Sequence, residues 1–432
     1  LALFGKLVPD MSQPISEAYL RSIGKAFDDA SRFIEGNVAI PAYAGIPQTR
    51  AAQALEHFAE SDRLLSQASK SDKYGETLKI GRKAMEELQM AFLLGFPSRK
   101  DEFRAVWCHS AFGIAGWSWD EAIKCLKENG FNAIVPNMLW AGLAYYPSEV
   151  LPTAEEIKEK GDQIDLCLKA CRKYGVQIHI WKVNWNLANA PGDFVERIRS
   201  EGRLQKDRSG NDVQWLCPTH PDNFKLELDS MLEIVRKYDV DGIHFDYIRY
   251  PNNNSCYCST CKEQFEKSKG LKIDNWPEAV ISGAYTEDFT LWRTEQITRL
   301  VQAVNEQARK INPKIKISAA VFNDYPNCIH NVGQDWKMWI ESGYLDFVCP
   351  MNYTADNDHF RNLVANQVKI VDRRIPLYPG IGASAPGLPP EQVAMQAHIA
   401  RTLNADGFII FNYDQTVATG VLPALRKGVT SE

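Results

Sequence analysis

The sequence predicts an α/β protein, a (β/α)8 TIM barrel with an N-terminal helical segment. From Phe103 on, eight short apolar runs alternate with amphipathic helical stretches, which is the pattern of a parallel sheet covered by helices. The chain has 432 residues, enough for a barrel of about 250 residues or more and a smaller part besides. We therefore expect a helical domain or hairpin over residues 1–100 and the barrel over residues 101–432. A doubly wound sheet is the alternative if one strand is wrongly assigned.

The first hundred residues are expected to be helical. Apolar residues recur at helical spacing over Thr49–Lys70 and Lys73–Leu94, and we expect an earlier helix over Ile15–Ile34. Gly95 suits a helix C-cap and Pro97 cannot continue a helix, so the last of these helices should end there.

Eight predicted strands follow, and the longer gaps after the second, third and fourth must hold extra loops. The strands are Phe103–His109, Asn132–Asn137, Gln177–Val183, Gly242–Ile248, Lys316–Phe322, Asp346–Tyr353, Pro376–Ala383 and Gly407–Tyr413. In a barrel of this kind the active site lies at the C-terminal ends of the strands. Those ends are rich in polar residues, Asn137 and Asn323 among them.

Composition excludes several classes of protein. Lys and Arg number 49 against 54 Asp and Glu, a net charge of −5, and no stripe of basic residues marks a nucleic-acid surface. The longest run without charge, Asn129–Ser148, is interrupted by Asn and Pro residues, so we expect no transmembrane span. The chain opens at Leu1 without a basic and then apolar leader, which leaves the sequence silent on export.

The fourth predicted strand carries the most informative motif, Asp241-Gly-Ile-His-Phe-Asp-Tyr-Ile-Arg-Tyr-Pro251. If Asp246 points into the barrel, alternation sends His244 inward one layer deeper and turns Ile243, Phe245 and Tyr247 toward the helices. A carboxylate at the mouth of a packed barrel is costly to bury unless it has partners or a task. Asp246 is therefore our candidate catalytic residue.

With this motif the chain resembles the glycosyl hydrolase-like family 10 proteins, a group of predicted glycosidases with a barrel domain. The matching stretches, in the family's order, are Phe103–Trp107, Tyr146–Ser148, His179–Trp181, Cys217–Pro221, Asp241–Pro251 and Gln334–Trp336 leading into Asp346–Tyr353. The resemblance implies a bacterial glycosidase acting on a poly- or oligosaccharide and exported to the periplasm or cell surface. The family's fourth strand usually carries two successive acids, and here the second is Tyr247.

A more remote similarity links the barrel to family 18 chitinases. Met351-Asn352-Tyr353 matches the Met-x-Tyr signature of their sixth strand, and Asp241 and Asp246 match two acids of their fourth. Ile248 stands where their catalytic acid should be, so chitinase chemistry is not carried over.

Glycoside hydrolysis normally uses two carboxyl groups, one as proton donor and one as nucleophile or base. We assign Asp246 to one role and Asp324 to the other, because Asp324 closely follows a short strand. Asp356, Asp358 and Asp414 also follow strands and are alternatives. Because Tyr247 and Ile248 replace acids, a barrel that binds glycan without cleaving it is the second hypothesis.

Sugar recognition calls for hydrogen-bonding groups and aromatic ring faces side by side. The predicted substrate-binding residues combine the two; they are His179, Trp181, Asn184, Tyr247, Arg249, Tyr353, Asn412 and Asp414.

Metal and nucleotide cofactors are not indicated for catalysis. The eight histidines form no H-x-H or H-x-x-x-H pair, and no phosphate-binding glycine loop occurs. Cys256, Cys258 and Cys261 are closely spaced, and they would hold a structural zinc ion if Cys217 or His220 supplied a fourth ligand. Free or partly disulfide-bonded thiols are the alternative.

Overall fold

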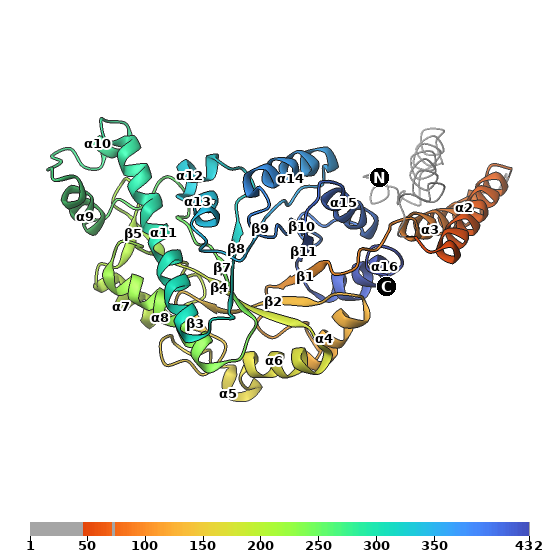
Figure 1. Ribbon diagram of the computed structural model, residues 1–432, viewed down its shortest axis with the longest axis horizontal. Coiled ribbons are helices and arrows are strands. Elements are labelled where there is room, and N and C mark those ends of the chain that lie inside the picture. Colours follow the sequence, from red (N-terminus) through yellow and green to blue (C-terminus); the bar gives the residue numbers. More distant parts are fainter. Residues whose placement is uncertain (1–45, 71–73, 432) are drawn as a thin grey trace.

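The computed structural model describes residues 46–70 and 74–431 (Figure 1). Two long helices open this part, α2 (Gln48–Ala68) and α3 (Tyr74–Leu94), close to the ranges that apolar spacing predicts. The helix expected over Ile15–Ile34 lies outside the described residues.

Eight parallel strands form the predicted barrel. They are β1 (Phe103–Cys108), β2 (Ala133–Trp140), β4 (Gln177–Val183), β7 (Gly242–Asp246), β8 (Lys316–Val321), β9 (Phe347–Pro350), β10 (Gly380–Gly382) and β11 (Gly407–Phe411). Hydrogen bonding connects them in the order β10-β11-β1-β2-β4-β7-β8-β9. Isolated parallel bridges, Val348 to Leu377 and Met351 to Gly380, close β9 onto β10. The closed order confirms the (β/α)8 barrel and excludes a doubly wound sheet.

Helices surround the strands, and their ends follow from local sequence. They are α4 (Trp119–Glu128), α6 (Gln163–Tyr174), α8 (Pro221–Lys237), α11 (Thr286–Ile311), α13 (Trp336–Glu341), α14 (Asn357–Val371), α15 (Pro390–Thr402) and α16 (Leu422–Leu425). Ser118 and Glu121 form a capping box at the start of α4. Gly175 ends α6 in the left-handed conformation that glycine adopts without strain.

Strand alternation divides the buried residues into an outer and an inner core. Ile243 and Phe245 belong to the outer core against the helices, as predicted. Trp107, Val135 and Trp181 belong to the inner cluster that fills the barrel. The barrel is thus a packed core whose C-terminal layer forms the floor of any site at its mouth.

Three long insertions carry the extra loops that the sequence gaps require. The first holds β3 (Leu143–Ala144) and α5 (Ile157–Lys160), and the second holds α7 (Gly192–Ser200) and the hairpin β5 (Leu204–Lys206) with β6 (Asp212–Leu216). The third holds α9 (Ser259–Lys269) and α10 (Glu278–Ile281) before α11; a later, shorter loop carries α12 (Asn327–Val332). In Figure 1, α9 and α10 lie at the opposite end of the molecule from α2 and α3.

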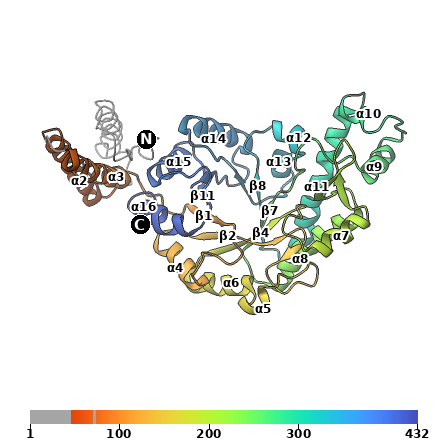
Figure 2. The ribbon, with the colours of Figure 1, turned by 180° about the vertical axis from the view of Figure 1, so that it is seen from behind.

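The N-terminal helix pair is anchored on the barrel by the end of α3. Phe92 is fully buried, and the Phe96 ring lies 5.6 Å from the His398 ring of α15. An Arg50 side-chain nitrogen of α2 donates to the Phe96 carbonyl oxygen at 3.1 Å. Both ribbon views place the pair beside α15 and α16 (Figures 1 and 2).

A bilayer crossing would require a long, strongly apolar helix. Within the part of the chain that the structure describes, no helix has the necessary combination of length and hydropathy.

Candidate active site

Asp246 is the last residue of β7, and it sits at the base of a cavity of about 280 Å³ at the barrel mouth. One carboxylate oxygen, Oδ1, accepts the Tyr247 backbone N–H at 2.6 Å, and the Asp246 carbonyl accepts the Asn184 N–H at 2.8 Å. The cavity is lined by Asp246, Tyr247, Arg249, Phe322, Asn323, Met351 and Tyr353. Its walls therefore combine three aromatic rings and a methionine with an amide, a guanidinium and one carboxyl group.

Burial controls the charge of this carboxyl group. Asp246 is 6% exposed, and desolvation raises its pKa to about 6. The Tyr247 amide, the Arg249 guanidinium and the Trp181 side chain each lower the pKa, but they do not offset the burial. The carboxyl group consequently keeps its proton to a pH at which most aspartates have lost theirs, which is what a proton donor requires.

Arg249 is held by aromatic rings and backbone carbonyls. Its guanidinium carbon lies 4.7 Å from the Tyr247 ring centre, 4.9 Å from that of Phe322 and 5.4 Å from that of Trp215. Its Nη1 donates to the Tyr250 carbonyl oxygen at 2.9 Å. Burial lowers the pKa of Arg249 and the nearby Asp246 raises it, so the stack holds a cation beside the carboxyl group.

Tyr247 does not follow the strand alternation predicted for it. Its φ of +53° is in the left-handed region, which is strained for a residue with a large side chain. The turn at the end of β7 brings the ring into the cavity wall, 5.6 Å from the Trp215 ring and near Arg249. Tyr247 therefore contributes an aromatic surface to the mouth instead of packing against the helices.

A hydrogen-bonded chain supports the floor below Asp246. The Trp107 indole N–H donates to His244 Nε2 at 3.0 Å, and His244 Nδ1 lies 2.8 Å from Ser318 Oγ. Burial lowers the pKa of His244 to about 3, so the ring is neutral. Because Nε2 accepts a hydrogen bond from the Trp107 N–H, the network assigns the ring hydrogen to Nδ1. His244 on β7 is thus hydrogen-bonded to β1 through Trp107 and to β8 through Ser318.

Two further polar groups of the barrel interior are unpaired. Both side-chain polar atoms of Asn137 and the indole Nε1 of Trp181 are buried and have no hydrogen-bond partner among the described residues. The two residues are register partners on β2 and β4. Trp181 is near enough to lower the pKa of Asp246 without making a hydrogen bond of normal geometry. Asn137 is the last residue of a predicted strand, but it is not among the site residues predicted from the sequence.

His179 and Asn184 do not reach the mouth. His179 pairs with Gly242 at the start of β7, and its ring lies edge-on to Phe347 at 5.2 Å, in the N-terminal layer of the barrel. Asn184 faces outward, where its Nδ2 donates to Glu227 Oε2 of α8 at 2.6 Å. Glu227 Oε1 also lies 3.6 Å from Lys182 Nζ, so Asn184 belongs to a buried polar cluster behind the wall.

The other candidate acids line different parts of the molecule. The Asp246 cavity is lined by Asn323 but not by Asp324. Asp414 accepts the Val417 N–H at 2.9 Å and borders a separate cavity of about 1070 Å³ between the β1 loop, α6 and the β11 loop. Asp356 caps the N-terminus of α14. Asn412, a predicted substrate-binding residue, instead accepts the His109 backbone N–H with its Oδ1 at 2.8 Å. Among the described residues, Asp246 is the sole carboxylate lining its cavity.

Tyr353, a predicted substrate-binding residue, lines the Asp246 cavity. Its ring stacks on Phe411 at 5.3 Å and meets Trp107 edge-on at 6.3 Å. Together with Tyr247 and Arg249, it forms the part of the predicted substrate site that the structure brings to Asp246.

Two curated bacterial proteins are similar in sequence. An S-layer-related protein of Niallia circulans is 23% identical over 360 residues, covering 68% of this chain and 22% of that protein. Glycosyl hydrolase YngK of Bacillus subtilis (strain 168) is 22% identical over 359 residues, covering 70% of this chain and 66% of YngK. The chain therefore spans about a fifth of the first relative and just under two thirds of the second.

Structural similarity supports the same architecture. The glycoside hydrolase domain of PgaB (BpsB) from Bordetella bronchiseptica superposes with a TM-score of 0.60 at 14% identity, covering 75% of this chain and 98% of that domain. This likeness establishes the barrel fold. The profile of the family Glycosyl hydrolase-like 10 matches residues 102–389, which include every barrel strand except β11. The chain belongs to the glycosyl hydrolase-like 10 family.

Proposed function

We propose that this protein is a glycoside hydrolase in which Asp246 donates a proton to the oxygen of the scissile glycosidic bond. The observation that carries the proposal is the buried Asp246 carboxyl group, with a pKa of about 6, at the base of an aromatic cavity. Family membership and the relative named glycosyl hydrolase YngK support it.

The chemistry assigned to Asp246 is general-acid catalysis. The protonated carboxyl group passes its proton to the glycosidic oxygen as the carbon–oxygen bond breaks, and the leaving sugar departs as an alcohol. Water then completes the hydrolysis at the anomeric carbon. Arg249 stands beside the carboxylate that remains, so its charge stabilises that product state.

Asp324 is our proposed second carboxylate, which would activate the water or attack the sugar. Its Oδ1 is buried without a hydrogen bond to any described residue, and the preceding residue, Asn323, lines the cavity. In this proposal the loop that holds Asp324 rearranges when substrate binds, so that the carboxylate reaches the sugar.

The proposed substrate is an uncharged carbohydrate. Tyr247 and Tyr353 supply aromatic surface to the cavity, and Asn323 supplies an amide for sugar hydroxyls. A cavity of about 280 Å³ suits a single sugar unit, with the rest of the chain running over the mouth.

The test compares wild type with Asp246→Asn, Asp324→Asn and the control Asp274→Asn, an exposed loop residue. Release of reducing ends is measured on purified neutral polysaccharides and on peptidoglycan. We expect Asp246→Asn to lower kcat at least about a hundredfold with binding retained, and Asp274→Asn to match wild type. Undiminished hydrolysis by Asp246→Asn would remove this residue from the mechanism, and undiminished hydrolysis by Asp324→Asn would remove the partner.

Glycan binding without cleavage is the second candidate, favoured by the single carboxylate that lines the cavity. In that case wild type binds a glycan in calorimetry and releases no reducing ends from it. Turnover of any glycan by wild type, lost in Asp246→Asn, excludes this candidate.

Export to the cell surface or periplasm is our proposal for location. It is supported by family membership and by the relative named as an S-layer-related protein. Immunodetection in fractionated cells tests it, and recovery of the native protein solely in the cytoplasm would contradict it.

A further inference from the structure

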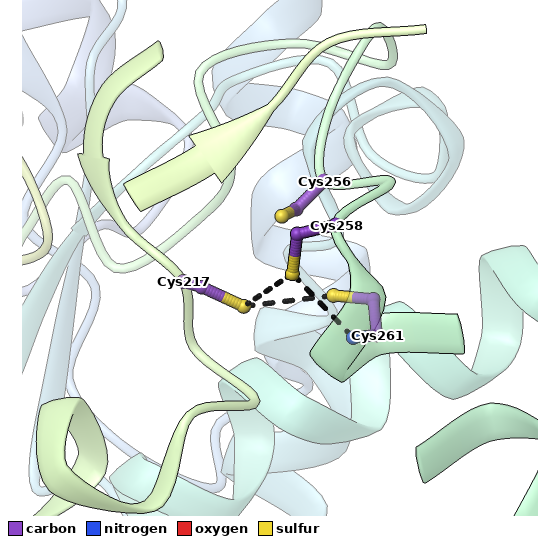
Figure 3. A group of neighbouring side chains, drawn as sticks. All are labelled: Cys217, Cys256, Cys258 and Cys261. Carbon is purple, nitrogen blue, oxygen red and sulfur yellow. Dashed lines mark hydrogen bonds between the residues drawn. The ribbon is translucent and has the colours of Figure 1, made fainter. Parts of the chain in front are cut away.

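Four cysteines from two insertions meet beside the hairpin β5–β6 (Figure 3). Cys217 follows β6, Cys256 and Cys258 lie in the loop after β7, and Cys261 is in the first turn of α9. Three of them are fully buried and Cys258 is 6% exposed. In the figure the four side chains gather around a common centre, and none of them lines the Asp246 cavity.

The spacing of the sulfur atoms matches a single tetrahedral ion. Cys217 Sγ lies 3.6 Å from Cys258 Sγ and 3.5 Å from Cys261 Sγ, and all four sulfurs lie within 4.8 Å of one another. Zinc–sulfur bonds of about 2.3 Å in a tetrahedron place the sulfurs about 3.8 Å apart. A disulfide requires about 2.0 Å, and the ten cysteines, all in the described part of the chain, are free.

Hydrogen-bond donors surround the sulfurs. The Cys261 backbone N–H points to Cys258 Sγ and the Lys206 N–H to Cys256 Sγ, both at 3.4 Å. The Thr219 hydroxyl oxygen lies 3.4 Å from Cys261 Sγ. Such donors favour thiolate sulfur and orient it toward a metal, as an outer layer of ligands does in metal sites. His220, the other fourth ligand considered from sequence, instead accepts the Asp222 N–H and caps α8.

We propose that Cys217, Cys256, Cys258 and Cys261 bind one Zn²⁺ ion in a closed, structural site. Four thiolates select a soft ion such as zinc over magnesium or calcium, and they leave no open position for substrate or water. Zinc binding by these four cysteines does not require that the chain hydrolyse glycans.

The ion would join two insertions that pack behind Tyr247 and Arg249, two lining residues of the Asp246 cavity. The Tyr257 N–H already donates to the Lys206 carbonyl oxygen at 2.9 Å across this junction. Trp215, two residues before Cys217, packs against Tyr247 and lies 5.4 Å from the Arg249 guanidinium. Fixing Cys217 therefore fixes the strand that supports the aromatic stack.

The test measures metal content by mass spectrometry of the protein purified under reducing conditions without added metal. We expect one zinc ion per chain in wild type and in the control Cys125→Ser, whose sulfur contacts the Ala418 carbonyl oxygen instead. Cys258→Ser should lose most of the zinc. Full zinc in Cys258→Ser, or iron at equal stoichiometry in wild type, would overturn the assignment.

A second measurement applies if Cys258→Ser does not fold. Wild type is stripped with a chelator under reducing conditions and titrated with Co²⁺, whose tetrahedral thiolate complexes absorb strongly in the visible and near ultraviolet. We expect saturation at one cobalt per chain and bleaching on addition of Zn²⁺. No absorption band, or a disulfide among these cysteines in unreduced peptides of the native protein, would refute the site.

Discussion

Replacing Asp246 with Asn is expected to stabilise the folded chain at neutral pH. In the folded state the pKa of this carboxyl group is about 6, and in the unfolded chain it has its ordinary value of 3.8. The folded state therefore binds the proton more tightly than the unfolded chain does. Proton binding at Asp246 stabilises the fold fully below pH 3.8, and this contribution is lost as the pH rises through 6. At about 1.4 kcal/mol for each pKa unit, the loss amounts to about 3 kcal/mol. An Asn at this position does not suffer this loss of stability, because its side chain is neutral at every pH and its oxygen can still accept the Tyr247 N–H.

The assay is urea unfolding of both proteins between pH 3.5 and 8, followed by tryptophan fluorescence. The free energy of unfolding of Asp246→Asn minus that of wild type should rise by about 3 kcal/mol between the acidic end and neutral pH, with most of the rise between pH 4 and 6. A difference that stays constant with pH would refute the reasoning, because it would mean that Asp246 binds its proton equally in both states.

Three further predictions concern the same wall of the barrel. The kcat of hydrolysis should decline above pH about 6 as Asp246 loses its proton; a pH–rate profile undiminished at pH 8 would contradict this. Trp215→Ala removes one ring from the Arg249 stack and should weaken glycan binding about tenfold in calorimetry, whereas unchanged affinity would exclude the stack from binding. Glu227→Gln leaves the Lys182 ammonium buried without its carboxylate and should cost about 3–5 kcal/mol in urea unfolding; a loss below about 1 kcal/mol would show that the pair is dispensable.

The barrel strands were predictable because buried parallel strands are local apolar runs in the sequence. The strand expected over Gly242–Ile248 is observed as Gly242–Asp246, and each of the other seven is found within its predicted range or within a few residues of it. The largest difference is at Pro376–Ala383, where β10 is only Gly380–Gly382. Two prolines precede this strand and have no N–H to donate, so regular pairing starts late.

The site could be predicted only in part, because a position near a strand end does not by itself decide whether a side chain points into the barrel. Asp246 and Arg249 both reach the cavity, although strand alternation alone would put residues three apart on opposite faces; the turn at Tyr247 brings them together. Asn184 does not reach the cavity, because strand alternation points Trp181 into the barrel and Asn184 outward. His179 does not reach it either, because it lies too near the start of its strand. Trp215 comes from an insertion, and no local pattern reports which strand a hairpin will pack against.

The junction of β9 and β10 has a consequence for how the barrel moves. Its pairing consists of the isolated bridges at Val348 and Met351, whereas β4 and β7 are joined by continuous register from His179 to Asp246. Local opening costs least where few backbone hydrogen bonds must break. Amide deuterium uptake should therefore be fastest at this seam among the barrel strands. Because Tyr353 comes shortly after the end of β9, this local opening would occur beside a ring that lines the Asp246 cavity.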